Sequence, residues 1–98
     1  MDWTFSSTPK LSRLLKNLEK RQQQLVDSYL EQIRGIMTDP QSGKKLRGDL
    51  NDYYSWDWKF QNVPLRICYK TISETNSILI VYFGTRQNFY EEVKNYVK

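Results

Sequence analysis

Two alternating runs of apolar and polar residues, separated by two polar residues, constrain the fold more than any other feature of the chain. The runs cover residues 54–60 and 63–69, and Gln61 and Asn62 lie between them, which is the length of a tight β-hairpin turn. Because side chains alternate between the two faces of a strand, a slip of one residue would place apolar side chains against polar ones. The predicted register pairs Phe60 with Val63, Trp58 with Leu65, Trp56 with Ile67 and Tyr54 with Tyr69.

The opposite face of this hairpin is polar and carries charge. The same register pairs Asp57 with Arg66, and it also pairs Ser55 with Cys68 and Tyr53 with Lys70. Arg66 then has two interpretations: a surface ion pair with Asp57, or a cation that binds a ligand on an open sheet face.

The residues before the hairpin predict an edge strand and two helices. Residues 3–7 alternate as a short edge strand would, and Ser7 or Thr8 can cap a helix that has Pro9 at its first position. Leucines at helical spacing follow, then a second periodic set over residues 25–37. We favour a helical hairpin over one long helix, and Asp39-Pro40 ends it because a residue before proline avoids the α region.

The residues around the hairpin complete an α+β fold. Residues 41–49 predict a loop, 78–83 a buried strand ending at Gly84, and 89–97 a short terminal helix. We expect one domain over residues 1–98, with the N-terminal helical hairpin packed on a mainly antiparallel four-stranded sheet. The other sheet face would be partly open, with Tyr54, Trp56 and Trp58 in the core on the helical side and Cys68 half-buried and inert.

The composition excludes several chemistries. The chain has no histidine and one cysteine, which excludes a His-ligated zinc site, a His-based triad and an internal disulfide. The net charge of +4 suits polyanionic partners. Neither a signal peptide nor a membrane helix is apparent, so we expect a cytoplasmic protein without membrane partner, metal or small-molecule cofactor.

Basic and aromatic residues predict a nucleic-acid surface on the open face. Cations hold phosphates and aromatic rings stack on unpaired bases, which is typical of RNA binding. Each residue also has a plainer interpretation: the loop lysines as a solvated turn, and the tyrosine as helix packing. The candidates are Arg66, Lys70, Arg86, Tyr90, Lys44, Lys45 and Arg47.

Four segments in order make the sequence similar to a known family. They are Lys45-Leu46-Arg47-Gly48-Asp49-Leu50, Tyr53-Tyr54-Ser55-Trp56, Leu65-Arg66-Ile67-Cys68-Tyr69, and Gly84-Thr85-Arg86 with Phe89-Tyr90. Together with the helical hairpin before them, they resemble the RelE/ParE superfamily of bacterial toxin–antitoxin toxins, over residues 44–90.

This resemblance implies a function as well as a fold. RelE-like members cut messenger RNA in the ribosomal A site and leave a 2′,3′-cyclic phosphate, whereas ParE-like members inhibit DNA gyrase. By resemblance, Arg66 and Arg86 match the phosphate-binding arginines, Tyr90 matches an active-site residue, and Lys44 or Lys45 matches the basic loop. A cognate antitoxin is implied as partner, with mRNA and the ribosome as targets of a RelE-like toxin.

The chemistry of such a cleavage can be argued from the residues. Attack by a ribose 2′-OH needs a proton acceptor and charge stabilisation on the phosphate. Without histidine, the acceptor would be a carboxylate, a perturbed tyrosine or lysine, or a group of the ribosome. Asp57 could be this base or could instead neutralise Arg66, and Tyr90 near Arg86 could have a lowered pKa. We expect a metal-independent endoribonuclease, with a gyrase inhibitor as the alternative.

Overall fold

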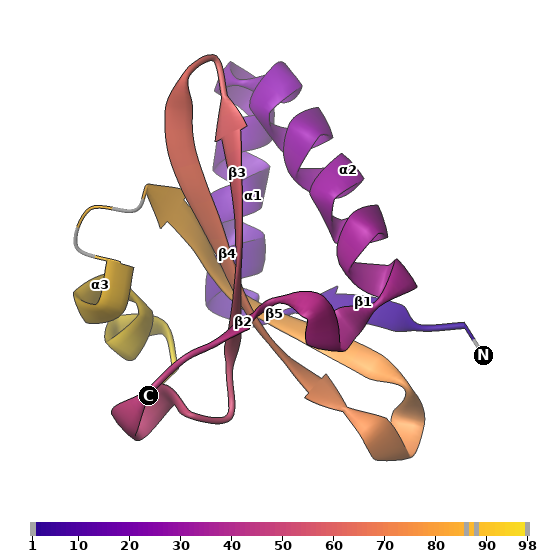
Figure 1. Cartoon of the computed structure of the whole chain (residues 1–98). Helices are drawn as coiled ribbons and strands as arrows, with labels where there is room; N and C mark the ends of the chain where they lie inside the picture. Colours follow the sequence, from indigo (N-terminus) through magenta and orange to yellow (C-terminus); the bar gives the residue numbers. More distant parts are fainter. Residues whose placement is uncertain (1, 86, 88, 98) are drawn as a thin grey trace.

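The chain begins with a strand and two helices, continues into a series of strands and ends with a helix (Figure 1). The structure, a computed structural model, describes residues 2–85, 87 and 89–97. The α+β class and the order of helices and strands predicted from the sequence are confirmed. The elements are β1 (Thr4–Ser7), α1 (Pro9–Arg21), α2 (Gln23–Thr38), β2 (Lys44–Lys45), β3 (Tyr54–Phe60), β4 (Val63–Ile72), β5 (Ser77–Thr85) and α3 (Phe89–Tyr96).

The described strands form one sheet in the order β1-β5-β4-β3-β2. Strand β1 is parallel to β5, and the other neighbours are antiparallel. The sheet therefore has five strands where four were expected. The additional strand is β2, which lies in the predicted loop 41–49 and pairs Lys44 with Ser55 and Lys45 with Tyr54. Two residues are too few to produce an alternating pattern, so the sequence could not reveal this strand.

The β3–β4 hairpin has the predicted register at every position, from Tyr54 opposite Tyr69 to Phe60 opposite Val63. Gln61 and Asn62 have φ values of +50° and +68°. Positive φ at both central residues is the geometry of a type I′ turn, whose twist matches that of the flanking strands. The turn and the apolar pattern therefore specify the same pairing.

The N-terminal helices begin and end where the local chemistry predicts. The Thr8 hydroxyl accepts a hydrogen bond from the Leu11 amide at 3.3 Å, with Pro9 as the first helical residue. Gln22, with φ of −138°, separates α1 from α2, so the helical hairpin is confirmed. Asp39 leaves the helical region before Pro40, as expected.

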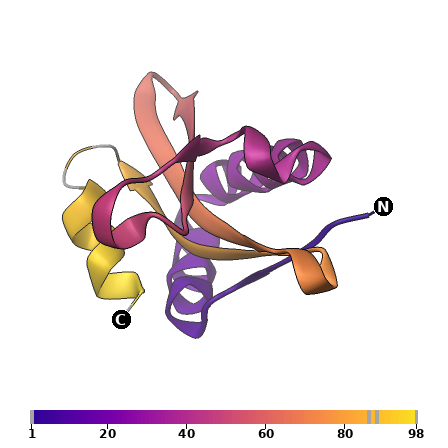
Figure 2. The same ribbon diagram turned by 60° about the horizontal axis from the view of Figure 1, so that its bottom comes forward.

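The main core lies between the sheet and the α1–α2 pair (Figure 2). Tyr29 of α2 packs against Phe83 of β5, with ring centroids 4.8 Å apart. Trp56 and Trp58 are half-buried beside this core, as predicted for the helical side. Their indole Nε1–H groups donate to Gln32 Oε1 and Ser28 Oγ, each at 3.0 Å, which fixes α2 against β3.

A second core lies on the opposite face of the sheet, beneath α3. Val81 has no partner in the β4–β5 register, because Cys68 faces Tyr82 and Tyr69 faces Ile80. This bulge shifts the alternation of β5, so Val81 and Tyr82 both reach the second core while Phe83 returns to the first. Strand β5 is therefore covered on both faces, as its continuous apolar sequence predicted.

The predicted open face is thus open only in part. Leu46, Leu50, Phe89 and Val93 cover its middle, and Cys68 beneath them is fully buried rather than half-buried. The partly open face is as expected, but half-burial of Cys68 was wrong, because apolar residues of the segment before β3 and of α3 pack over the thiol. No helix in the described part of the chain is long and apolar enough to cross a membrane.

Candidate nucleic-acid interface

Arg66 is held between a carboxylate and an aromatic ring on the α3 side of the sheet. Its Nε donates to Asp57 Oδ1 at 2.8 Å, across the β3–β4 pair. Its guanidinium lies over the Phe89 ring, 5.2 Å from the centroid. The arginine side chain is 16% exposed and the aspartate 45% exposed. The ion pair between Arg66 and Asp57 is confirmed, and together with the Phe89 ring it orients an arginine of which only a small part remains exposed.

Helix α3 brings two aromatic side chains to this site. Phe89 is buried, and the Tyr90 ring meets it edge-on at 5.8 Å while remaining 44% exposed. Tyr90 is therefore not mainly a core residue, and it stands one aromatic ring away from Arg66. Arg86, predicted to complete the cluster, lies outside the described residues, so its contact with Tyr90 stays a prediction.

Two residues at this site, Gly84 and Phe89, were part of a family segment of the sequence and were not predicted as site residues. Gly84 is the cross-strand neighbour of Arg66, and a Cβ on it would clash with the Tyr82 phenol. Because glycine has no side chain, this position leaves room for the Tyr82 phenol. Phe89, whose ring lies beneath the Arg66 guanidinium, is the second of these residues. The sequence carried a signal for Phe89, because two adjacent aromatic residues, Phe89 and Tyr90, begin the terminal helix.

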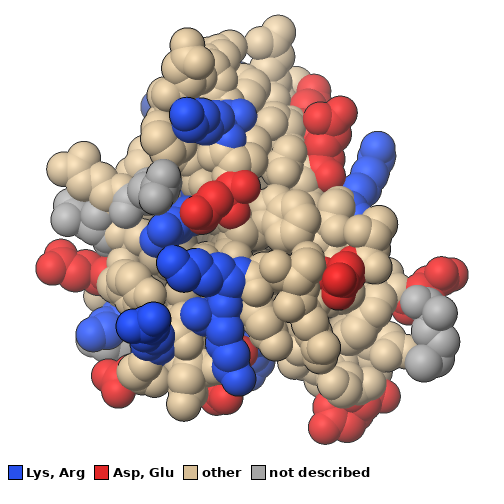
Figure 3. Space-filling model, in the orientation of Figure 1, with Lys and Arg blue, Asp and Glu red and all other residues tan. Residues whose placement is uncertain are grey.

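The lysines divide between two hollows beside the Arg66 site. Lys44 shares a shallow hollow of about 260 Å³ with Asp57 and Ser55. Lys45 and Lys70 line a larger hollow of about 440 Å³. Arg47 is exposed but lines neither of them. Figure 3 shows Lys and Arg side chains gathered on the face around β2 and α3, interrupted by acidic side chains.

Lys70 stands on the same face of β4 as Arg66, four residues further along. A strand rises about 3.3 Å per residue, so the Cα atoms of Arg66 and Lys70 are about 13 Å apart. The Lys70 ammonium lies 5.8 Å from the centroid of the Tyr53 ring, the neighbour that the hairpin register predicted. Desolvation by burial raises the pKa of Tyr53, with smaller contributions from Cys68 and Asp52.

Cys68, between Arg66 and Lys70, takes no part in the surface. Burial raises the pKa of its thiol to about 12, so the sulfur stays protonated near neutral pH. That the cysteine is inert stays a prediction, which its burial supports.

This arrangement has the groups that phosphate chemistry uses. A guanidinium offers paired donors to phosphate oxygens, and an exposed carboxylate beside it can accept a proton. Lys44 and Lys70, which the sheet register places on the same face as Arg66, would hold flanking phosphates. No group of three or more metal-ligating side chains is found among residues 2–85, 87 and 89–97.

Several solved structures share this fold, and at least two of them contain toxins. Free RelE of E. coli, in a variant with two arginines changed to alanine, superposes with a TM-score of 0.72 at 20% identity, over 98% of this chain and 94% of that one. The toxin–antitoxin complex RelBE2 of Mycobacterium tuberculosis gives a TM-score of 0.67 at 20% identity, over 88% and 100%. A conserved hypothetical protein of Helicobacter pylori, HP0892, gives 0.61 at 22% identity, over 89% and 98%. The chain therefore has the RelE fold.

The family follows from the sequence itself. The model of the ParE-like toxins of type II bacterial toxin–antitoxin systems matches residues 5–94. The chain belongs to this family and is thus the toxin of a toxin–antitoxin pair, as the resemblance implied. No curated protein matches the sequence.

Proposed function

We propose that this toxin is a ribosome-dependent mRNA endonuclease that cleaves by attack of a ribose 2′-OH on the adjacent phosphate. The observation that supports the proposal is the Arg66–Asp57 pair, a guanidinium and a carboxylate 2.8 Å apart on a lysine-bearing face. Inhibition of another protein by surface contact would require no such pairing of a phosphate-binding group with a proton acceptor.

Each residue has a distinct role in this proposal. Arg66 uses Nε for Asp57, so its Nη groups point to the phosphate and stabilise the phosphorane. Asp57 takes the proton of the 2′-OH. Tyr90 stands at the edge of the site to contact the flanking base or the leaving oxygen, and Arg86 supplies a second cation. The 2′-oxygen forms a bond to phosphorus as the bond from phosphorus to the 5′-oxygen breaks, the Tyr90 hydroxyl or a solvent water protonates the leaving 5′-oxygen, and the product is a 2′,3′-cyclic phosphate.

The partners follow from the same site. Lys44, Lys45, Arg47 and Lys70 would hold the message beside Arg66, and the ribosome would present it in the A site. A cognate antitoxin would cover this face. The reaction needs no metal or small-molecule cofactor, takes place in the cytoplasm and uses residues 1–98 as one domain.

Primer extension on a defined message in a reconstituted translation system tests this function. Wild type should cut at fixed positions within codons only when ribosomes are present. Arg66→Ala should lower the cleavage rate by about 100- to 1000-fold, the usual effect of removing one donor to a developing negative charge. Arg34→Ala is the matched control, because Arg34 is an exposed arginine on α2, away from the α3 side. An intact message in a culture whose growth still stops would overturn the proposal.

Inhibition of DNA gyrase is the second candidate, favoured by the ParE-like family model. The Asp57 carboxylate would then neutralise Arg66 and leave a protein-binding surface. Purified toxin that blocks supercoiling by gyrase while leaving mRNA intact would establish this alternative. Loss of that inhibition in Arg66→Ala would show that gyrase binds the sheet face that carries Arg66.

A further inference from the structure

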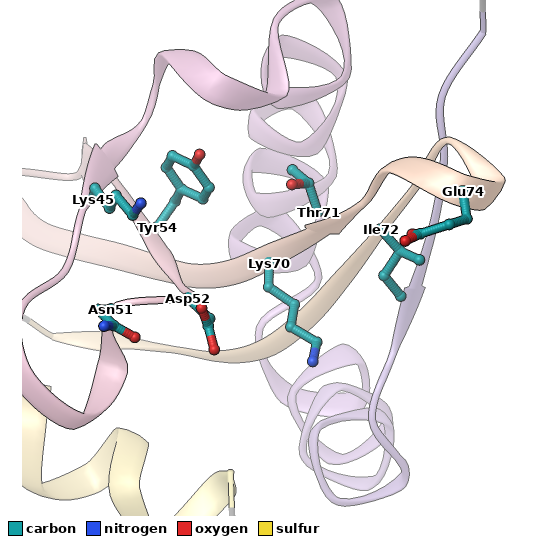
Figure 4. Close-up of a pocket in the computed structure, with 8 residues that line it drawn as sticks. All are labelled: Lys45, Asn51, Asp52, Tyr54, Lys70, Thr71, Ile72 and Glu74. Atoms are coloured by element: carbon teal, nitrogen blue, oxygen red, sulfur yellow. The ribbon is translucent and has the colours of Figure 1, made fainter.

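The hollow that Lys45 and Lys70 line lies where β3 stops pairing with β4. Pairing between β3 and β4 ends at Tyr54 opposite Tyr69, whereas β4 continues beside β5 as far as Ile72 opposite Ser77. Residues 70–72 thus form an open strand edge, and the hollow of about 440 Å³ lies along it. Figure 4 shows Lys45 and Tyr54 on one side of this space and Thr71, Ile72 and Glu74 on the other.

Charged and polar side chains surround this hollow, and of these Lys70 also lies near the Tyr53 ring. Lys45 and Lys70 are cationic, Asp52 and Glu74 are anionic, and Asn51 offers both a donor and an acceptor. None of these side chains forms a hydrogen bond or an ion pair with another residue in the described part of the chain. Facing surface charges usually pair with each other or point outward, so a hollow with both kinds unpaired can accept a ligand that presents donors and acceptors together.

The hollow also has a fixed aromatic wall. Tyr54 is stacked on Tyr69, with centroids 5.5 Å apart and planes inclined by 16°. Tyr69 is fully buried and donates from its hydroxyl to the Pro40 carbonyl at 2.7 Å. The Tyr54 ring, exposed in part, is thereby held in place. Aromatic side chains of this kind stack on unpaired RNA bases.

We propose that this hollow is a guanine-nucleotide subsite, with Asp52 as the reader of the base. A carboxylate only accepts hydrogen bonds, and the Watson–Crick edge of guanine presents two adjacent N–H donors to it. Guanine also carries O6 and N7 acceptors, which suit a lysine ammonium. Uracil presents a single N–H between two carbonyls, so the same carboxylate would repel it.

The subsite rests on the proposed function for its biological substrate, because a base bound here would belong to the message. Lys70 joins the hollow to the cleavage site, as it lines the hollow and shares a strand face with Arg66, with about 13 Å between the two Cα atoms. That separation spans a few nucleotides of single strand. The subsite would therefore select a guanine close to the cut rather than at it.

Titration of ¹⁵N-labelled wild-type protein with nucleoside monophosphates tests the subsite without any cleavage. GMP should shift the amide signals of Asn51, Asp52 and Thr71 and bind at least about tenfold more tightly than UMP, as one good bidentate base contact discriminates by 1–3 kcal/mol. Asp52→Asn should remove this preference. Asp49→Asn is the matched control, because Asp49 is an exposed aspartate of the same segment that does not line the hollow.

The outcomes separate the subsite from the nuclease. Equal shifts with all four nucleotides, or with inorganic phosphate, overturn the guanine subsite even if the message is cut. Selective GMP binding with an intact message supports the subsite and overturns only the nuclease. If the message is cut, Asp52→Asn should also change the bases found beside the cuts, and an unchanged cleavage map in that variant would contradict the subsite.

Discussion

Arg66 and Asp57 face each other across β3 and β4, and their ion pair engages Nε of the arginine rather than its terminal nitrogens. The guanidinium also lies over the Phe89 ring, with 5.2 Å between its carbon atom and the ring centroid. The arginine is therefore oriented by two side chains from different elements, and no described acceptor engages its Nη groups. Orientation of this kind reduces the rotamer entropy lost when an anion binds.

Removing the carboxylate of Asp57 should separate its role in cleavage from its role in stability. Asp57→Asn should change the free energy of unfolding by less than about 1 kcal/mol, because the pair is partly exposed. The ribosome-dependent cleavage rate should fall by about 100-fold or more as the proton acceptor is lost. A variant that cuts faster than wild type would show instead that Asp57 restrains Arg66. Urea unfolding and primer extension measure the two effects.

Tyr90 should matter for activity and hardly at all for stability. The side chain is 44% exposed, so Tyr90→Phe should stay within about 0.5 kcal/mol of wild type in urea unfolding. Its mRNA cleavage should decrease if the hydroxyl takes part in the reaction. Tyr96→Phe, on the same helix but packed against Tyr82, is the control that should cut normally. Equal cleavage by both variants would remove the Tyr90 hydroxyl from the mechanism.

The hydrogen bond between Trp58 and Ser28 should contribute measurably to stability. Ser28→Ala removes the acceptor of the indole N–H and should lower the free energy of unfolding by about 1 kcal/mol. A double-mutant cycle with Trp58→Phe measures the pair directly, because each single variant breaks the same bond. The expected interaction energy is about 0.5–1.5 kcal/mol. Additive effects would mean that the bond contributes nothing in solution.

The hairpin turn should be improved by residues that favour positive φ. Gln61 has φ of +50° and Asn62 has φ of +68°. Asn-Gly is the preferred pair for a type I′ turn, so Gln61→Asn combined with Asn62→Gly should raise the free energy of unfolding by about 0.5–1 kcal/mol. Thermal unfolding followed by circular dichroism measures this. A lower midpoint would contradict the turn assignment.

Alkaline pH should destabilise the fold in a defined window. Burial raises the pKa of Cys68 from 9.0 and that of Tyr29 and Tyr69 from 10.0, each to about 12. The unfolded chain therefore loses these protons first, and stability is complete below pH 9 and declines between pH 9 and 12. Each group contributes a slope of about 1.4 kcal/mol per pH unit within its window.

Replacing Cys68 should show how much of the loss of stability at alkaline pH comes from its thiol. In Cys68→Val the decrease should begin near pH 10, where only the tyrosines contribute, instead of near pH 9. Urea unfolding at half-unit steps from pH 8 to 11 measures the difference. Identical curves for wild type and variant would mean that the thiol does not stay protonated through burial.

The sequence by itself determined the hairpin, the caps and the family. Alternation together with the two-residue turn at Gln61 and Asn62 specifies one register, and the Thr8 cap depends on neighbouring residues alone. The pairing of Arg66 with Asp57 follows from that register, which is why it could be predicted.

Only the tertiary structure decided the features that depend on distant segments meeting. The two-residue strand β2, the bulge at Val81 and the lid over Cys68 have no periodic pattern of their own. The Phe89 ring reaches Arg66 because α3 folds back over the sheet, and the hollow beside Tyr54 exists because β3 ends before β4 does. Local patterns encode which residues share a face, whereas packing between elements determines which faces close and which stay open.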